Sequence, residues 1–193
     1  MEKHDSEKKK ILLEVEKNLK RLDTPGFAKF IPEVGSNLAY AAKGAKSYMD
    51  VAAVPGRIRN AMGRPVYMKP AFGASTHIAS QILEAMKYDP GTRSSLNLRY
   101  SEEIISAAKS LGCMVVFVDR MKEPEEIQKI EGASVPWVLR TAHRQCGKVP
   151  DILYDRGSVG KEAITHILGR NPGEVVDIAL KILKMLASSS DMK

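Results

Sequence analysis

Short apolar segments alternate along most of this chain with segments that have the apolar spacing of helices. Such alternation is typical of a layered α/β domain, in which helices cover a central sheet. The segments that we expect to form strands are 37–42, 65–69, 95–98, 113–118 and 151–154. The segments that we expect to form helices are 75–87, 101–111, 123–131, 134–145, 160–169 and 173–187.

The alternation begins only after residue 26, and the residues before it follow a different pattern. Residues 6–22 place Ile11, Val15 and Leu19 at helical spacing, and the sequence DTPG that follows ends the helix. We therefore expect an N-terminal helix or linker over residues 1–26 and the main domain over residues 27–193.

Composition excludes several classes of protein. The sequence has no stretch of about 18 apolar residues, which excludes a transmembrane helix, and no apolar segment follows the charged N-terminus to make a signal peptide. Cys113 and Cys146 are too few for a disulfide scaffold and lack the spacing of a metal site. We therefore expect a cytoplasmic protein with reduced thiols and no membrane partner.

The positive charge of the chain is concentrated in one segment. The formal net charge is +7, and residues 57–100 hold seven basic side chains against only two acidic ones. A local basic field indicates an anionic partner, which could be nucleic acid, an anionic lipid surface or a phosphorylated small molecule.

Two parts of this basic segment have features of a phosphate site. Arg57 and Arg59 follow a Pro-Gly turn, and the planar guanidinium group suits bidentate contact with phosphate. Gly73, Ala74 and Ser75 open a predicted helix, where small residues let backbone N–H groups approach an anion. The alternatives are a solvated basic loop in the first case and an ordinary N-cap serine in the second.

Charged and polar residues also stand at the ends of predicted strands. Asn97 and Arg99 lie on the same side of one strand by the period of two, and Asp119 and Arg120 follow the apolar strand over 113–118. Open α/β folds bind ligands at the carboxyl ends of strands. The alternative for Asp119 and Arg120 is a turn cap followed by a solvated side chain.

The stretch DILYDRGSVGKE at residues 151–162 is the most characteristic one. A strand runs through Asp155 into a loop at Gly157, and Lys161 opens the predicted helix over 160–169, an arrangement that resembles a phosphate cradle. The sequence is not a Walker A motif, because Glu162 stands where that motif has its Mg²⁺-binding Ser or Thr. Asp155 and Glu162 are instead candidate ligands for Mg²⁺ bridging to a diphosphate.

The histidines give a weaker signal. His143 lies on a predicted helix near two arginines and is a candidate general base. His166, in the middle of the predicted 160–169 helix, is expected to pack or to be partly exposed. The four histidines and two cysteines form no metal cluster of known spacing.

Taken together, these segments resemble the ThiN-type thiamine-phosphate synthase domain from about residue 27 to 188. This domain occurs alone, behind hydroxymethylpyrimidine/phosphomethylpyrimidine kinases, or behind the helix-turn-helix of thiamine-responsive regulators. The residues that carry the resemblance are PEVGSNLAYA at 32–41, DVAAVPGRIR at 50–59, FGAS at 72–75, NLRY at 97–100, DR at 119–120, EP at 123–124, PDILYDRG at 150–157 and GKE at 160–162.

The resemblance implies a fold and a reaction. It implies a three-layer α/β/α domain like the class II aldolases, although this sequence has no obvious histidine triad for their zinc. It also implies that hydroxymethylpyrimidine diphosphate and thiazole phosphate are joined to give thiamine phosphate and diphosphate, with Mg²⁺ as cofactor. The residues that match the family's turnover residues are Arg120 and His143, and Arg57, Arg59, Gly73, Ala74, Ser75, Asn97, Arg99, Asp155, Gly157 and Lys161 are the expected phosphate-binding residues.

Two hypotheses of different class follow. The first is a transferase, which we expect to be a homodimer acting on phosphorylated small molecules. The second is a non-catalytic module that senses thiamine phosphate, detached from a kinase or regulator. Nucleic-acid binding ranks third, because the basic segment lacks interleaved aromatic residues and the N-terminal segment is too short for a helix-turn-helix.

Overall fold

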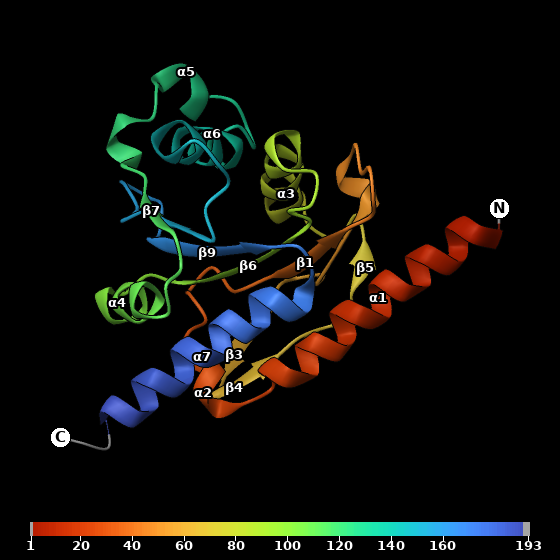
Figure 1. The fold of residues 1–193 in the computed structure, drawn as a ribbon, viewed down its shortest axis with the longest axis horizontal. Helices are drawn as coiled ribbons and strands as arrows, with labels where there is room; N and C mark the ends of the chain where they lie inside the picture. Colours follow the sequence, from red (N-terminus) through yellow and green to blue (C-terminus); the bar gives the residue numbers. More distant parts are fainter. Residues whose placement is uncertain (1, 191–193) are drawn as a thin grey trace.

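A seven-stranded sheet runs through the middle of the molecule (Figure 1). The structure, a computed structural model, describes the backbone of residues 2–190 and the side chains of residues 6–188. The strand order is β5-β2-β1-β6-β9-β8-β7, and neighbours are antiparallel except for β7 and β8. These strands are β1 (Leu38–Ala41), β2 (Val51–Ala53), β5 (Ala71–Phe72), β6 (Ser94–Arg99), β7 (Val115–Phe117), β8 (Ile152–Tyr154) and β9 (Ile164–Gly169). Strands β3 (Arg59–Ala61) and β4 (Arg64–Val66) form a separate hairpin.

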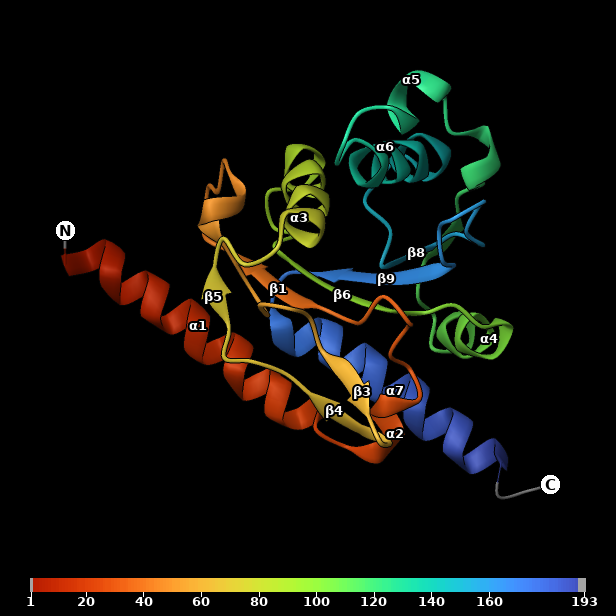
Figure 2. The same ribbon diagram turned by 180° about the vertical axis from the view of Figure 1, so that it is seen from behind.

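Helices cover both faces of this sheet (Figure 2). Helices α1 (Glu2–Leu22), α4 (Glu102–Ser110) and α7 (Pro172–Ser190) pack on one face, with the short α2 (Pro25–Ala28) beside them. Helices α3 (Thr76–Tyr88) and α6 (Ser134–Cys146) pack on the other face, below the short α5 (Glu125–Gln128). Two 3₁₀ turns, η1 (Tyr48–Asp50) and η2 (Arg120–Lys122), complete the elements. The expected three-layer α/β/α fold with an N-terminal helix is confirmed.

The N-terminal helix is part of the main core. Ile11, Val15, Leu19 and Leu22 are buried at the helical spacing seen in the sequence, in the same apolar cluster as residues of α7 and the sheet. Burying apolar side chains stabilises a fold by about 25 cal/mol for each Å² of apolar surface removed from water. The helix is therefore packed into the domain, and residue 26, the expected boundary, lies within the short helix α2 beside the same core.

Strands β6 and β9 position the functional face of the sheet. In β6, Leu96 and Leu98 enter the core beneath α7, so the side chain of Asn97 faces the α3 and α6 side. In β9, Ile167 enters the same core beneath α7, and His166 pairs in register with Asn97. Both polar side chains therefore lie on the same face of the sheet.

Some expected elements differ in the structure. The helix expected over 160–169 is wrong: residues 164–169 form β9 in the middle of the sheet, because their β-branched residues alternate between two faces. The expected helix over 123–131 shortens to α5, and the strand expected over 65–69 is β4 of the outlying hairpin. No helix in the described part of the chain combines the length and apolar character needed to span a bilayer.

Candidate functional site

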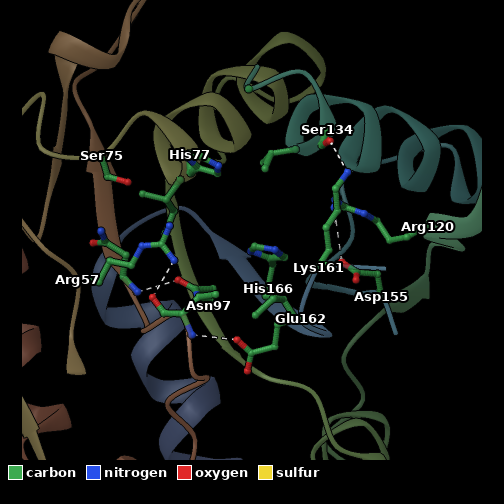
Figure 3. Close-up of a pocket in the computed structure, with 17 residues that line it drawn as sticks. Arg57, Ser75, His77, Asn97, Arg120, Ser134, Asp155, Lys161, Glu162 and His166 are labelled. Atoms are coloured by element: carbon green, nitrogen blue, oxygen red, sulfur yellow. Dashed lines mark hydrogen bonds and ion pairs between the residues drawn. The ribbon is translucent and has the colours of Figure 1, made fainter. Parts of the chain in front are cut away.

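A cleft of about 310 Å³ opens on the α3 and α6 side of the sheet (Figure 3). Ligand pockets in proteins begin at about this size. Arg57 and Ser75 lie at one end, Arg120 and Lys161 lie at the other, and His166 lies between them. The cleft brings together seven residues singled out from the sequence, which are Arg57, Ser75, Asn97, Arg120, Asp155, Lys161 and Glu162.

A second hollow of about 320 Å³ adjoins the first end and shares Arg57 and Ser75 with it. Arg59, Gly73 and Ala74 complete its lining, so the two predicted phosphate segments meet here. Gly73 has a φ of 72°, and an added Cβ would lie 2.8 Å from the Met49 sulfur. A side chain is therefore excluded at Gly73, and the backbone of this loop stays open to the hollow.

Arg57 is held in an uncommon backbone conformation. Its φ is 68°, in the left-handed region that residues other than glycine seldom adopt. Its Nη1 donates to the Val34 carbonyl oxygen at 2.8 Å, and Arg59 donates to the Glu33 carbonyl oxygen at 3.1 Å. Burial, and then the nearby charge of Arg59, hold the pKa of Arg57 below its ordinary value. Two guanidinium groups beside a hollow are an arrangement that an anion would stabilise.

Glu162 ties two loops together. Its carboxylate accepts the backbone N–H groups of Glu33 and Val34 at 2.8 and 2.9 Å, one on each oxygen. The carboxylate therefore holds the loop at residues 33–34 against the loop before β9. Each oxygen accepts one N–H group, so the contacts in the structure give Glu162 a role in holding this loop, and its role as a metal ligand stays a prediction.

The other end of the cleft is an ion-pair network. Lys161 Nζ donates to Glu123 Oε2 at 3.0 Å and to Ser134 Oγ at 3.1 Å, and Arg120 Nε lies 3.5 Å from the same Glu123 oxygen. Glu123 is buried, with 1% of its side chain exposed. Burial opposes its ionisation, but hydrogen bonds from Ser134 and Lys161 and the charge of Arg120 together hold the pKa of Glu123 below its ordinary value. This carboxylate therefore keeps two cations in place at the cleft.

Asp155 completes that network. It lies at the end of β8, with Arg120 Nη1 3.9 Å from its Oδ2 and the Gly157 N–H donating to its Oδ1 at 2.8 Å. Burial raises the pKa of Asp155, although the Arg120 charge and the Gly157 N–H act in the opposite direction. Asp155 thus orients Arg120. The carboxylate of Asp155 is itself buried, so water does not stabilise its negative charge.

The glycine loop after Asp155 is not the start of a helix. Residues Ser158 and Lys161 bridge each other in a tight turn, and an added Cβ at Gly157 would collide with the Lys161 carbonyl oxygen. The expected phosphate cradle on a helix N-terminus is therefore wrong at this point, because β9 follows the loop. Lys161 still reaches the cleft, from the turn rather than from a helix.

The residues proposed for Mg²⁺ are engaged by other protein groups. Asp155 is engaged by Arg120 and by a backbone amide, and Glu162 by two backbone amides. Within the described residues, no group of three or more His, Cys, Asp or Glu side chains is arranged to hold a metal ion. Asp155 and Glu162 are therefore held by protein groups in this arrangement, and their role as metal ligands stays a prediction.

Two of the predicted site residues lie elsewhere. Arg99 is the last residue of β6, where the alternation of faces ends, and it lines a separate pocket with Phe30 and Leu183 on the α7 side. His143 stacks on Tyr88 of α3 with ring centroids 3.9 Å apart and does not line the cleft. The structure therefore places neither Arg99 nor His143 beside the other predicted site residues.

Sequence reasoning also missed residues of the cleft. Ser134 and His166 line it, and Glu123 stands behind it, yet none was a candidate. Asn97 is present as expected but serves the fold: its Oδ1 accepts the Asn37 N–H and its Nδ2 donates to the Gly35 carbonyl oxygen. Alternation within 164–169 separates His166 from Thr165 and Ile167, and the pairing of His166 with Asn97 sets the face that the two residues share.

Comparisons with known proteins identify the family of the chain. Residues 14–181 match the family described as thiamine-phosphate synthase ThiN. The chain belongs to this family. The thiamine-phosphate synthase ThiN of Methanothermobacter thermautotrophicus is 40% identical over 163 residues, which cover 84% of this chain and 86% of that protein. The chain is therefore a transferase enzyme of thiamine biosynthesis.

Other relatives show how the domain is used and how it folds. The bifunctional thiamine biosynthesis protein ThiDN of Methanocaldococcus jannaschii is 41% identical over 148 residues, which make up 76% of this chain but 34% of that protein. The crystal structure of the C-terminal domain of phosphomethylpyrimidine kinase matches with a TM-score of 0.86 at 38% identity, over 91% of this chain and all of that one. L-fuculose-1-phosphate aldolase from Thermus thermophilus shares the fold alone, with a TM-score of 0.51 at 11% identity over 93% and 94% of the two chains.

Proposed function

We propose that the protein joins hydroxymethylpyrimidine diphosphate to thiazole phosphate, giving thiamine phosphate and diphosphate. The thiazole nitrogen donates its lone pair to the pyrimidine methylene carbon and forms a C–N bond. The C–O bond to the diphosphate breaks, and its electron pair leaves with the diphosphate. The nitrogen becomes a thiazolium cation, so the joining step itself transfers no proton.

The observation that carries the proposal is a cleft with cations at both ends in a chain of this family. Arg57 and Arg59 lie at or beside one end, and Arg120 and Lys161 lie at the other. Both substrates carry phosphate groups, and the new bond must form between them. A cleft with separated cations suits two phosphorylated molecules whose reacting atoms, the thiazole nitrogen and the methylene carbon, meet in the middle.

We assign the diphosphate to the Arg120 and Lys161 end. Negative charge develops on the departing diphosphate in the transition state, and fixed cations in a water-poor site stabilise such charge strongly. Glu123 and Asp155 hold these cations in position before the substrate arrives. The thiazole phosphate then takes the Arg57 and Ser75 end, with the loop at Gly73 beside it.

In the proposed reaction, Mg²⁺ binds to the diphosphate of the substrate. Mg²⁺ commonly binds through substrate phosphates and keeps several of its waters. Because Asp155 and Glu162 are already engaged, we place no step of the reaction on a protein-bound ion. A diphosphate that carries its own Mg²⁺ is consistent with the lining of the cleft.

The test is to incubate the purified chain with both substrates and Mg²⁺ and to measure thiamine phosphate. We expect product, and we expect Lys161→Met to raise the KM for the pyrimidine diphosphate and Arg57→Met to raise the KM for the thiazole phosphate. Tight binding of thiamine phosphate without any product would instead favour the sensing module. The opposite pattern of KM changes would reverse the assignment of the two ends.

A further inference from the structure

His166 occupies the middle of the cleft, between the two groups of cations (Figure 3). It lies on β9 and pairs in register with Asn97 of β6 and Leu153 of β8, so three paired strands fix its backbone. Its neighbours Thr165 and Ile167 are buried and do not line the cleft. The backbone that carries the imidazole is thus held between β6 and β8, inside the sheet.

The Nδ1 atom of His166 is buried and has no hydrogen-bond partner among the described residues. Buried polar atoms in folded proteins are nearly always paired, with protein, water or a ligand. The polar groups nearest in the sheet are already used, since both amide atoms of Asn97 bond to backbone groups. His166 as a whole is partly exposed and lines the cleft, so an imidazole whose Nδ1 has no partner among the described residues is placed where a bound molecule can meet it.

The imidazole is uncharged in the working range of pH. Burial, and then the charge of Arg120, lower the pKa of His166 to about 3. A neutral imidazole has one donor nitrogen and one acceptor nitrogen. It adds no charge to attract phosphate, so it suits a neutral polar group better than an anion.

The chemistry of the two substrates decides which of their rings the imidazole of His166 can bind. The aminopyrimidine ring carries an N–H₂ donor beside a ring nitrogen acceptor, so it can pair with either nitrogen of an imidazole. The thiazole has no N–H, and its ring nitrogen must keep its lone pair free to attack. A hydrogen bond from His166 to that nitrogen would therefore oppose the reaction.

We propose that His166 binds the aminopyrimidine ring through a hydrogen bond and thereby places the methylene carbon between the two ends of the cleft. This inference rests on the proposed function. It makes His166 a binding residue that recognises the ring, while the phosphates are recognised by the cations. The expected consequence is that His166 affects pyrimidine diphosphate and inorganic diphosphate differently.

Calorimetric titration of three variants tests this inference. His166→Leu removes the hydrogen bond, and His166→Asn keeps a neutral donor and acceptor. Thr165→Val is the matched control, because it removes another unpartnered buried polar atom from the neighbouring position on β9. Each variant and the unmodified chain are titrated with hydroxymethylpyrimidine diphosphate and with inorganic diphosphate, and turnover of the unmodified chain is measured separately.

We expect His166→Leu to bind pyrimidine diphosphate about tenfold more weakly, the size of one hydrogen bond, and inorganic diphosphate unchanged. His166→Asn should recover part of the loss, and Thr165→Val should behave like the unmodified chain. Equal weakening of both ligands, or no weakening, overturns the role of His166. Absence of turnover in the unmodified chain overturns the proposed function instead, and a selective loss in His166→Leu would still support ring recognition in that case.

Discussion

Replacing Arg120 with methionine gives the clearest test of the ion-pair network. Arg120 is 11% exposed and lies beside Glu123 and Asp155, whose side chains are 1% and 4% exposed. Removing one partner of a buried ion pair costs about 3–5 kcal/mol, because the other charge is left uncompensated. Since Lys161 still pairs with Glu123, we expect a loss of about 3 kcal/mol in the free energy of unfolding.

The loss should depend on pH in a defined direction. Burial raises the pKa of Asp155, so this group contributes most to stability when protonated, below its ordinary value of 3.8, and the contribution is lost as pH rises through the folded value. Glu123 has a lowered pKa, so its contribution is present at neutral pH and is lost in acid. Arg120 favours the ionised form of both, and its removal should cost more at pH 8 than at pH 4.

Urea unfolding at pH 4 and pH 8 measures this difference. Lys122→Met is the control, because Lys122 belongs to the same 3₁₀ turn but its pair with Asp119 is exposed and is worth less than about 1 kcal/mol. A loss in Arg120→Met that is equal at the two pH values would show that packing, not charge, is responsible. No loss at either pH would refute the network as a stabilising element.

Four further outcomes are expected. Glu162→Gln should lower the free energy of unfolding by about 1–2 kcal/mol, measured in urea, because a charged acceptor for two N–H groups is lost. His143→Ala should lower the free energy of unfolding by about 1 kcal/mol, because the stacking on Tyr88 is lost. Both KM values should stay unchanged, and a fall in kcat of tenfold or more would show that His143 acts in catalysis. Chelation with EDTA should abolish turnover and added Mg²⁺ should restore it, while full activity in EDTA would exclude the metal. Light scattering should give twice the chain mass of 21.3 kDa, and a single-chain mass would contradict the predicted homodimer.

Local patterns predicted the parts of the fold that local physics determines. The helical spacing of α1 was visible in the sequence, but its burial against α7 depends on contacts between opposite ends of the chain. The Pro-Gly turn predicted the loop that carries Arg57, and the small residues at 73–75 predicted the open loop before α3. Turn residues and glycine mark both segments in the sequence.

The remaining site residues depend on tertiary pairing. A glycine and a lysine before residues 164–169 suggested a helix start, and this interpretation hid His166, whose position follows from pairing with β6 and β8. Glu123 lies in a run of acidic residues that is typical of a solvated surface. Its burial comes from the approach of Lys161, 38 residues further along the chain.

A crystal structure with inorganic diphosphate bound would test the central claim most directly. We predict diphosphate at the Arg120 and Lys161 end of the cleft, with His166 uncovered beside it. Diphosphate in the pocket of Arg99, on the opposite side of the sheet, would contradict the assignment of the active site.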